Sequence, residues 1–402
     1  MKKVATQLWG NIKYTNFKPQ EVITLLCLYI VALTHYDDSF IAISLYLVLP
    51  FAFIINVNYK HIFNNNKHLK RLCILYLWIV FCSLFAENIV LVGIEIKKIL
   101  GCFFSCYVIS KQASDQKRIY FLYFIYILFL VSTWDYALTH LWDIRDYGDA
   151  QLSDDTNKLN ANTFAYFTTY ATFIIYVLGE IKNKFGKFLK ILFPLTLVLS
   201  FLTAIVSSSR QLLIIQVPLI VLLLINRYQI KKGKNIFVLL FLVGASIFLF
   251  DSIGQRFYDN SYLSRRAENS VMEDTRILIA KEAFNIGLEN PFVGVGPGNV
   301  SSNISTGNFS HNTFLELFAG TGIIGCILFC ILLGTFVKKQ YDRYRMTHDR
   351  FFMAFLIFGI IWTFDQLFYV FHDGLWLISF FILVCTHSDV YYNENYIKLY
   401  KK

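Results

Sequence analysis

The sequence has few charged residues. Only 16% of its 402 residues are Asp, Glu, Lys or Arg, whereas 56% are hydrophobic and 18% are aromatic. Soluble domains average about 25% charged residues, so a water-soluble globule of this composition would lack the polar side chains to cover its surface. This composition excludes a soluble enzyme and an intrinsically disordered chain.

Several signatures of specific chemistry are also missing from the sequence. All eight cysteines lie inside apolar runs, so the sequence predicts no disulfide framework outside a membrane. There is no Cys/His spacing typical of a metal site, no phosphate-binding P-loop and no visible internal repeat. We therefore expect no metal and no cofactor.

The sequence does contain many apolar runs of about 17–22 residues, the length that a helix needs to cross a bilayer of about 30 Å. They lie near residues 21–36, 39–57, 72–86, 89–110, 119–134, 163–181, 188–206, 211–226, 236–251, 313–337, 352–371 and 374–391. The runs predict an all-α polytopic membrane protein with about 12 transmembrane helices.

The positive residues behind the net charge of +10 are concentrated in alternate connections between these runs. Every second connection is basic, and the connections between them carry acids or few charges. By the positive-inside rule the basic connections are cytoplasmic, which places both termini in the cytoplasm. The charge is then a signal of topology, with some attraction to membrane lipid, and nucleic-acid binding is not expected. The basic connections are 60–71, 111–118, 182–190, 227–234, 338–350 and 398–402.

The expected organisation has five parts. A cytoplasmic tail, 1–20, has lysines and no cleavage site of a signal peptide. Helices 1–9 span 21–251, a large extracytoplasmic loop covers 252–312, helices 10–12 span 313–391, and 392–402 form a second cytoplasmic tail. The loop contains an amphipathic stretch, Thr275 to Asn290, and a glycine-rich turn, Gly294 to Asn299. A loop of this length is more typical of function than of a linker.

His311 and Asn312 stand where the chain returns to the membrane, at the expected start of a helix. The N–H groups at a helix start favour anions, and a neutral imidazole at the membrane surface accepts a proton near pH 7. The alternative is an interfacial histidine that is hydrogen-bonded to a loop. Ala319, Gly322 and Gly325 are expected on one small-residue face that permits close helix packing.

Arg210 stands at a very short extracytoplasmic connection between two apolar runs. Its rigid guanidinium is suited to bidentate phosphate recognition, and the alternative is a side chain that snorkels to lipid headgroups. Arg276 opens the amphipathic stretch and would complete a site for a doubly charged phosphate. Arg265 and Arg266 are further candidates for substrate binding, with a solvated polar face as the alternative.

Lys98 lies within the fourth apolar run, at a spacing that lets it pair with Glu95 on one helix face. It is a candidate for substrate binding if it reaches a polar cavity.

Taken together, these motifs resemble the O-antigen ligase/polymerase superfamily of bacterial inner membranes. The resemblance rests on the pair His311-Asn312 followed by Gly322-x-x-Gly325, on the preceding glycine-rich turn, and on Ser209-Arg210 at the end of a span. It covers most of the chain and implies a large periplasmic loop before the histidine helix.

The resemblance implies a metal-independent glycosyltransferase of the inner membrane whose active site faces the periplasm. The donor would be an undecaprenyl-diphosphate-linked glycan, and the acceptor lipid A–core or a lipid-linked glycan. His311 would be the general base on the acceptor hydroxyl, and Arg210 and Arg276 would hold the diphosphate. Direct attack would invert the anomeric carbon. The oligomeric state is not predicted.

Within the superfamily the sequence favours an O-antigen ligase, because the N-terminal tail, the lysine-bearing fourth span and the length resemble enterobacterial ligases. Those ligases often have Glu directly after the His-Asn pair, whereas here Thr313 follows and the nearest acid is Glu316. The alternatives are an O-antigen or other polysaccharide polymerase and, in a different class, a flippase or transporter of lipid-linked oligosaccharides.

Overall fold

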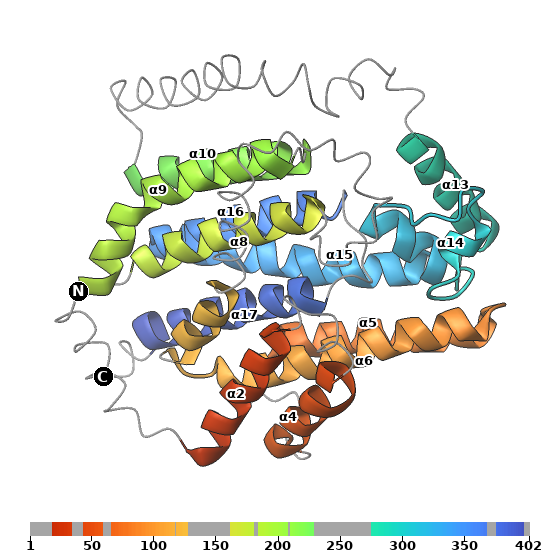
Figure 1. The fold of residues 1–402 in the computed structure, drawn as a ribbon, viewed down its shortest axis with the longest axis horizontal. Coiled ribbons are helices and arrows are strands. Elements are labelled where there is room, and N and C mark those ends of the chain that lie inside the picture. The colour runs from red at the N-terminus through yellow and green to blue at the C-terminus, as the bar shows by residue number, and fades with distance from the viewer. Residues whose placement is uncertain are drawn as a thin grey trace. The chain divides into compact units, whose positions relative to one another are not determined.

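The structure is a computed structural model, and all regular elements in its described residues are helical (Figure 1). The described residues are 18–33, 43–58, 66–116, 118–127, 161–180, 184–207, 210–228, 275–367 and 375–397. Described helices lie over eleven of the twelve apolar runs, and the run 236–251 is outside the described residues.

Two of the described helices are long and apolar enough to cross a membrane, Lys67–Phe85 and Thr313–Thr347. Shorter apolar helical segments of 10–17 residues are Pro19–Val31, Ser44–Asn56, Arg118–Ile127, Thr168–Gly179 and Pro218–Arg227. The total of about 12 crossings stays a prediction. A backbone inside lipid must satisfy its own polar groups, which is why long apolar runs form helices.

The chain divides into two compact units, which are described separately. The first unit comprises 1–125, 275–343 and 362–402. Its helices are α2 (Pro19–Leu33), α4 (Leu49–Asn56), α5 (Lys67–Cys82), α6 (Ile89–Gln112), α13 (Thr275–Glu289), α14 (Val300–Asn303), most of α15 (Thr313–Thr347), the end of α16 (Arg350–Asp365) and α17 (Leu375–Tyr392). A π-helical turn precedes α4 at Ser44–Val48, a 3-10 turn, Ser83–Phe85, follows α5, and a second π-helical turn, Asn393–Ile397, follows α17.

Asparagine side chains fix the starts of α5 and α6. The Oδ1 atoms of Asn66 and Asn88 each accept hydrogen bonds from two backbone N–H groups of the following turn. These caps satisfy donors that have no partner within the helix, so they define where each helix begins.

The core of the first unit is aromatic. The ring of Phe381 on α17 lies 5.2 Å from that of Phe336 on α15 and 5.4 Å from that of Trp362 on α16. Near the end of α15, the guanidinium of Arg343 lies 2.8 Å from the carboxylate of Asp389. The side chains of Arg343 and Asp389 are only 7% and 19% exposed. Their pairing compensates the charge of Arg343 inside the bundle.

The second unit comprises 126–274 and 344–361. Its described helices are α8 (Ala161–Gly179), α9 (Lys184–Ser207), α10 (Arg210–Tyr228) and the first turns of α16. Arg227 lies over the rings of Tyr176 and Phe193, at 4.4 and 4.5 Å, and pairs with Glu180 at 3.1 Å. These contacts join α8, α9 and α10 at one end of the helices.

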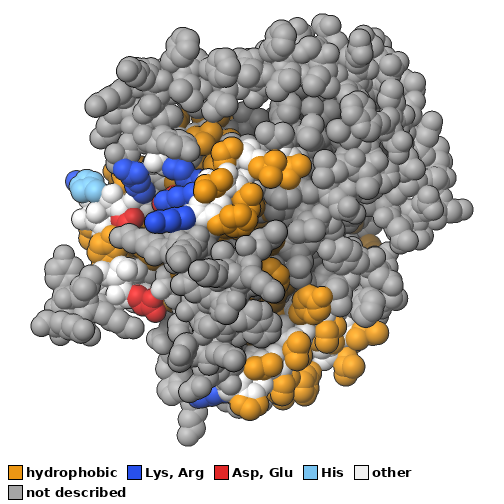
Figure 2. All heavy atoms as spheres, turned by 60° about the vertical axis from the view of Figure 1, so that its left-hand side comes forward, with side chains coloured by type: hydrophobic (Ala, Val, Ile, Leu, Met, Phe, Trp, Pro, Cys, Tyr) orange, Lys and Arg blue, Asp and Glu red, His pale blue; other side chains and the backbone are white. Residues whose placement is uncertain are grey.

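Apolar side chains are exposed along the long helices. On α15, Ile323, Ile327 and Ile331 are 42–49% exposed, and Leu77 on α5 is 64% exposed. On the face drawn in Figure 2, hydrophobic side chains stand beside a cluster of Lys and Arg. Exposed apolar surface of this extent is typical of helices that face lipid.

The amphipathic stretch of the large loop is a helix, α13, with apolar residues on its buried side and also on an exposed side. Ile279 and Ala283 are buried, whereas Ile277, Phe284 and Leu288 on the other side of the same helix are 46–56% exposed. The buried face packs with Val300, Ile304 and Ala319 in a small core.

Candidate functional site

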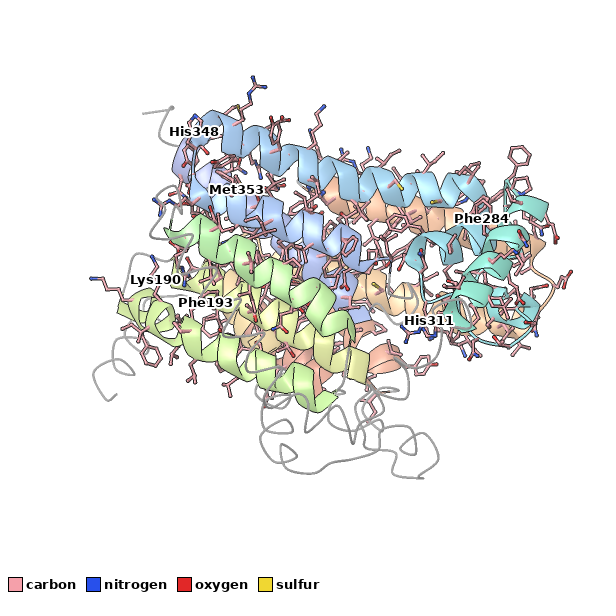
Figure 3. The ribbon with its side chains drawn as sticks, turned by 90° about the horizontal axis from the view of Figure 1, so that it is seen from above. Lys190, Phe193, Phe284, His311, His348 and Met353 are labelled. Atoms are coloured by element: carbon pink, nitrogen blue, oxygen red, sulfur yellow. The ribbon has the colours of Figure 1, made fainter. Side chains whose placement is uncertain are left out.

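The candidate site is built around His311, which lies two residues before the first residue of α15 (Figure 3). The histidine is half-buried, and its backbone has φ +50°, in the left-handed region. That conformation costs a residue other than glycine about 1–2 kcal/mol. Neighbouring contacts must therefore hold it.

Asn312 is the N-cap of α15. Its Oδ1 accepts hydrogen bonds from the N–H groups of Phe314 at 3.0 Å and Leu315 at 3.1 Å. The cap fixes the start of the helix one residue after His311, and the positive end of the helix dipole lies there. The histidine is thus placed beside a helix start that favours anions, as expected from the sequence.

A buried hydrogen-bonded pair lies on the other side of His311. Ser310 is 2% exposed and Glu316 is 5% exposed. Glu316 Oε2 accepts from Ser310 Oγ at 2.6 Å and from the Ser310 N–H at 3.1 Å. Ser310 Oγ in turn accepts from the Asn312 N–H at 3.4 Å. The bend that carries His311 is therefore tied to the first turn of α15.

The first residue of α15 is also fixed. The N–H of Thr313 donates to the carbonyl of Gln366 at 2.9 Å, and its hydroxyl donates to Gln366 Oε1 at 3.2 Å. Thr313 is fully buried. These contacts tie the start of α15 to the residue that follows α16.

The glycine-rich turn packs against a break in α15. Gly322 has φ +70° and ψ −175°, which interrupts the helix. A Cβ at Gly322 would overlap the backbone of Phe292, so only glycine fits. Our expectation of a continuous small-residue face over Ala319, Gly322 and Gly325 is therefore wrong, because the helix changes direction between them.

The backbone groups released by the break find other partners. The N–H of Ile323 donates to the carbonyl of Pro291 at 2.8 Å, and the N–H of Val295 donates to that of Ala319 at 2.9 Å. The indole of Trp78 on α5 donates to the carbonyl of Thr321 at 2.9 Å. These hydrogen bonds supply partners for backbone groups at the break.

Asn299 ends the glycine-rich turn and joins it to the start of α6. It is 1% exposed, and its Oδ1 accepts from the N–H of Asn88 at 3.0 Å while its Nδ2 donates to the Asn88 carbonyl at 3.4 Å. Further along, Ser305 donates its hydroxyl and N–H to Glu282 on α13, at 2.7 and 2.8 Å. These two hydrogen bonds lower the pKa of Glu282.

A partly open cavity lies between α5, α6, the glycine-rich turn and α15. Two carboxylates from distant parts of the sequence, Glu95 and Glu316, line it. The remaining lining residues are Ile79, Ile99, Pro297, Gly298, Val300, Leu317, Gly320 and Thr321. The cavity is mostly apolar with a few polar groups, as binding sites commonly are.

The structure describes the side chains of only some of the other candidate residues. Arg276 is the second residue of α13 and is exposed, and Lys98 on α6 is half-buried. Arg210 is the first residue of α10, directly after the α9–α10 connection, but its side chain is not described. Arg265 and Arg266 lie outside the described residues.

The structure does not test whether the two principal arginines and the histidine meet. His311 and Arg276 belong to the first unit and Arg210 to the second. Their convergence stays a prediction.

Sequence reasoning missed the roles of Ser310, Glu316 and Asn299. Asn299 precedes the short helix α14 but makes no side-chain capping bond, and its contact with the distant Asn88 has no local signal in the sequence. The contact between Ser310 and Glu316 does have a local signal, since a residue just before a helix is close to its first turn. The shared cavity of Glu95 and Glu316 has no such signal.

Comparison with known families agrees with the resemblance. The family model described as O-antigen ligase matches residues 195–330, a segment that contains Arg210, Arg276 and His311. No curated protein and no solved structure matches the chain. The family and the apolar helices show a membrane protein. The chain therefore carries an O-antigen ligase family domain over residues 195–330.

Proposed function

We propose that the protein is an O-antigen ligase that transfers a glycan from undecaprenyl diphosphate to lipid A–core at the periplasmic face of the bacterial inner membrane. The observation that carries the proposal is His311, held by its neighbours at the start of α15 inside a segment that matches the family. The family includes ligases and polymerases that act on lipid-linked glycans.

In the proposed reaction the acceptor hydroxyl attacks the anomeric carbon of the donor. His311 takes the hydroxyl proton as general base, and the bond between the sugar and the diphosphate breaks with its electron pair on the leaving oxygen. Arg210 and Arg276 stabilise the charge that develops on the diphosphate. The anomeric carbon is inverted, and the proposal requires neither a metal nor a covalent intermediate.

The remaining candidates have secondary roles in this proposal. Arg265, Arg266 and Lys98 contact the donor or the acceptor through their positive charges. Asn312 contributes through its Nδ2, because its Oδ1 caps α15.

The proposal is tested with purified protein in detergent, a lipid-linked donor and lipid A–core. We expect His311→Ala and Arg210→Ala to abolish transfer, because the first removes the base and the second a phosphate ligand. His348→Ala is a matched control, since His348 also has φ +50° but is exposed at the far end of α15. Lys281→Ala, an exposed cation on α13, is the control for Arg276→Ala. Full transfer by His311→Ala would refute the mechanism.

The same assay separates the alternative classes. A transporter forms no product in detergent, because transport needs a sealed compartment. A polymerase is distinguished in cells. Loss of a ligase leaves long lipid-linked polymer without attachment, whereas loss of a polymerase leaves lipid A–core with a single repeat. Thr313, where related ligases often have Glu, is the feature of this sequence that favours the polymerase alternative.

A further inference from the structure

We propose that Glu316 is a positioning residue for His311 and acts through Ser310. The inference rests on the proposed function, because it concerns the geometry of the proposed general base. Glu316 itself takes no proton from the acceptor in this scheme. It holds the bend from which the imidazole projects.

The geometry of the pair supports a holding role. One carboxylate oxygen, Oε2, receives both the hydroxyl and the N–H of Ser310, at 2.6 and 3.1 Å. Both residues are at least 95% buried, so water does not compete for these bonds. A carboxylate in the first turns of a helix is also favoured by the helix dipole.

His311 has a backbone conformation that needs such support. Its φ of +50° lies between two fixed neighbours, Ser310 before it and the capping residue Asn312 after it. If Ser310 were released, the bend would be free to relax toward an ordinary conformation with negative φ. The imidazole would then leave the position from which it reaches the acceptor.

The Ser310 hydroxyl links the two sides of the histidine. It donates to Glu316 and accepts from the N–H of Asn312 at 3.4 Å. Removal of this single oxygen breaks the hydroxyl's bonds to Glu316 and Asn312 but leaves the 3.1 Å bond from the Ser310 N–H to Glu316, without changing a charge or the helix cap. Ser310→Ala is for this reason the most specific variant.

The test compares Ser310→Ala, Glu316→Ala and Glu316→Gln in the purified transfer assay. We expect Ser310→Ala and Glu316→Ala to lower kcat about 10- to 100-fold, because a displacement of about 1 Å has an effect of that order, with KM changed much less. Glu316→Gln should stay within a few-fold of wild type, since its amide oxygen accepts the same two bonds. The acidic limb of its pH–rate profile should not move.

Glu282 and Ser305 provide a matched control. They form the same pairing of a serine hydroxyl and N–H with a glutamate, on the exposed side of α13. Glu282→Ala should leave kcat unchanged. Thermal unfolding of each variant checks that it is folded, and Ser310→Ala carries the test if Glu316→Ala does not fold.

Wild-type kcat in Ser310→Ala would overturn the inference. An equal loss of kcat in Glu316→Gln and Glu316→Ala would also overturn it. A shift of the acidic limb of the pH–rate profile in Glu316→Gln would do the same, because each of these results would assign the effect to the charge of Glu316. Full activity of His311→Ala would instead refute the proposed function. An inactive His311→Ala beside a normal Ser310→Ala would refute the positioning role alone.

Discussion

Substitution of Gly322 by alanine tests the central feature of the candidate site, the break in α15. The residue has φ +70° and ψ −175°, and its missing side chain leaves room for the backbone of Phe292 and for the N–H of Val293. An added Cβ would overlap this backbone. The glycine-rich turn would then have to move away from α15.

The cost can be added up from the structure. Holding alanine in this region of φ and ψ costs about 1–3 kcal/mol. Moving the turn breaks two hydrogen bonds, Ile323 N–H to Pro291 and Val295 N–H to Ala319, at 2.8 and 2.9 Å. Each contributes about 1 kcal/mol. We therefore expect Gly322→Ala to lower the free energy of unfolding by about 3–5 kcal/mol.

Gly334 is the matched control on the same helix. A Cβ there would have no heavy atom within 4 Å, and its φ is not in the left-handed region. Alanine is a better helix former than glycine, so Gly334→Ala should raise stability by up to about 1 kcal/mol. In detergent, Tm followed by tryptophan fluorescence should fall by about 5 °C or more for Gly322→Ala only. Equal Tm values for the two variants would refute this account of the break.

Two further predictions concern contacts outside the histidine bend. Hydrogen bonds from Ser305 hold the pKa of Glu282 below 4.5, so their stabilisation is present above pH 4.5 and is lost as the pH falls through the lower folded-state pKa. In Glu282→Gln, hydrogen exchange of the Ser305 amide should lose this pH dependence, and an unchanged profile would contradict the assignment. Arg343→Ala should destabilise the protein by about 3 kcal/mol, because it leaves the partly buried Asp389 with one cation fewer. Substitution of the exposed Lys338 by alanine is the control. Equal Tm values for Arg343→Ala and Lys338→Ala would contradict a stabilising role of the Arg343–Asp389 pair.

The positions of the helices could be predicted from the sequence because one physical requirement dominates. Apolar runs in lipid must satisfy their backbone internally, so hydropathy alone locates them. The starts of α5, α6 and α15 are marked by Asn66, Asn88 and Asn312, which cap them. Local chemistry of this kind can be found in a sequence.

The break in α15 could not be predicted in this way. The pattern around Gly322 is that of a continuous apolar helix, and the reason for the break is the backbone of Phe292, which approaches from another segment. For the same reason the cavity shared by Glu95 and Glu316 was missed. Contacts between distant segments depend on tertiary packing, which local patterns do not encode.

The two residues of the His311-Asn312 pair have distinct structural roles that explain why they are adjacent. Asn312 uses its Oδ1 to begin the helix, and this fixes the direction of α15. His311 lies just outside the first turn, and its left-handed φ turns the chain there. A residue inside the helix would point its side chain along the helix surface instead. His311, the proposed base, therefore lies at the positive end of a helix dipole, where the proposed diphosphate would also be favoured.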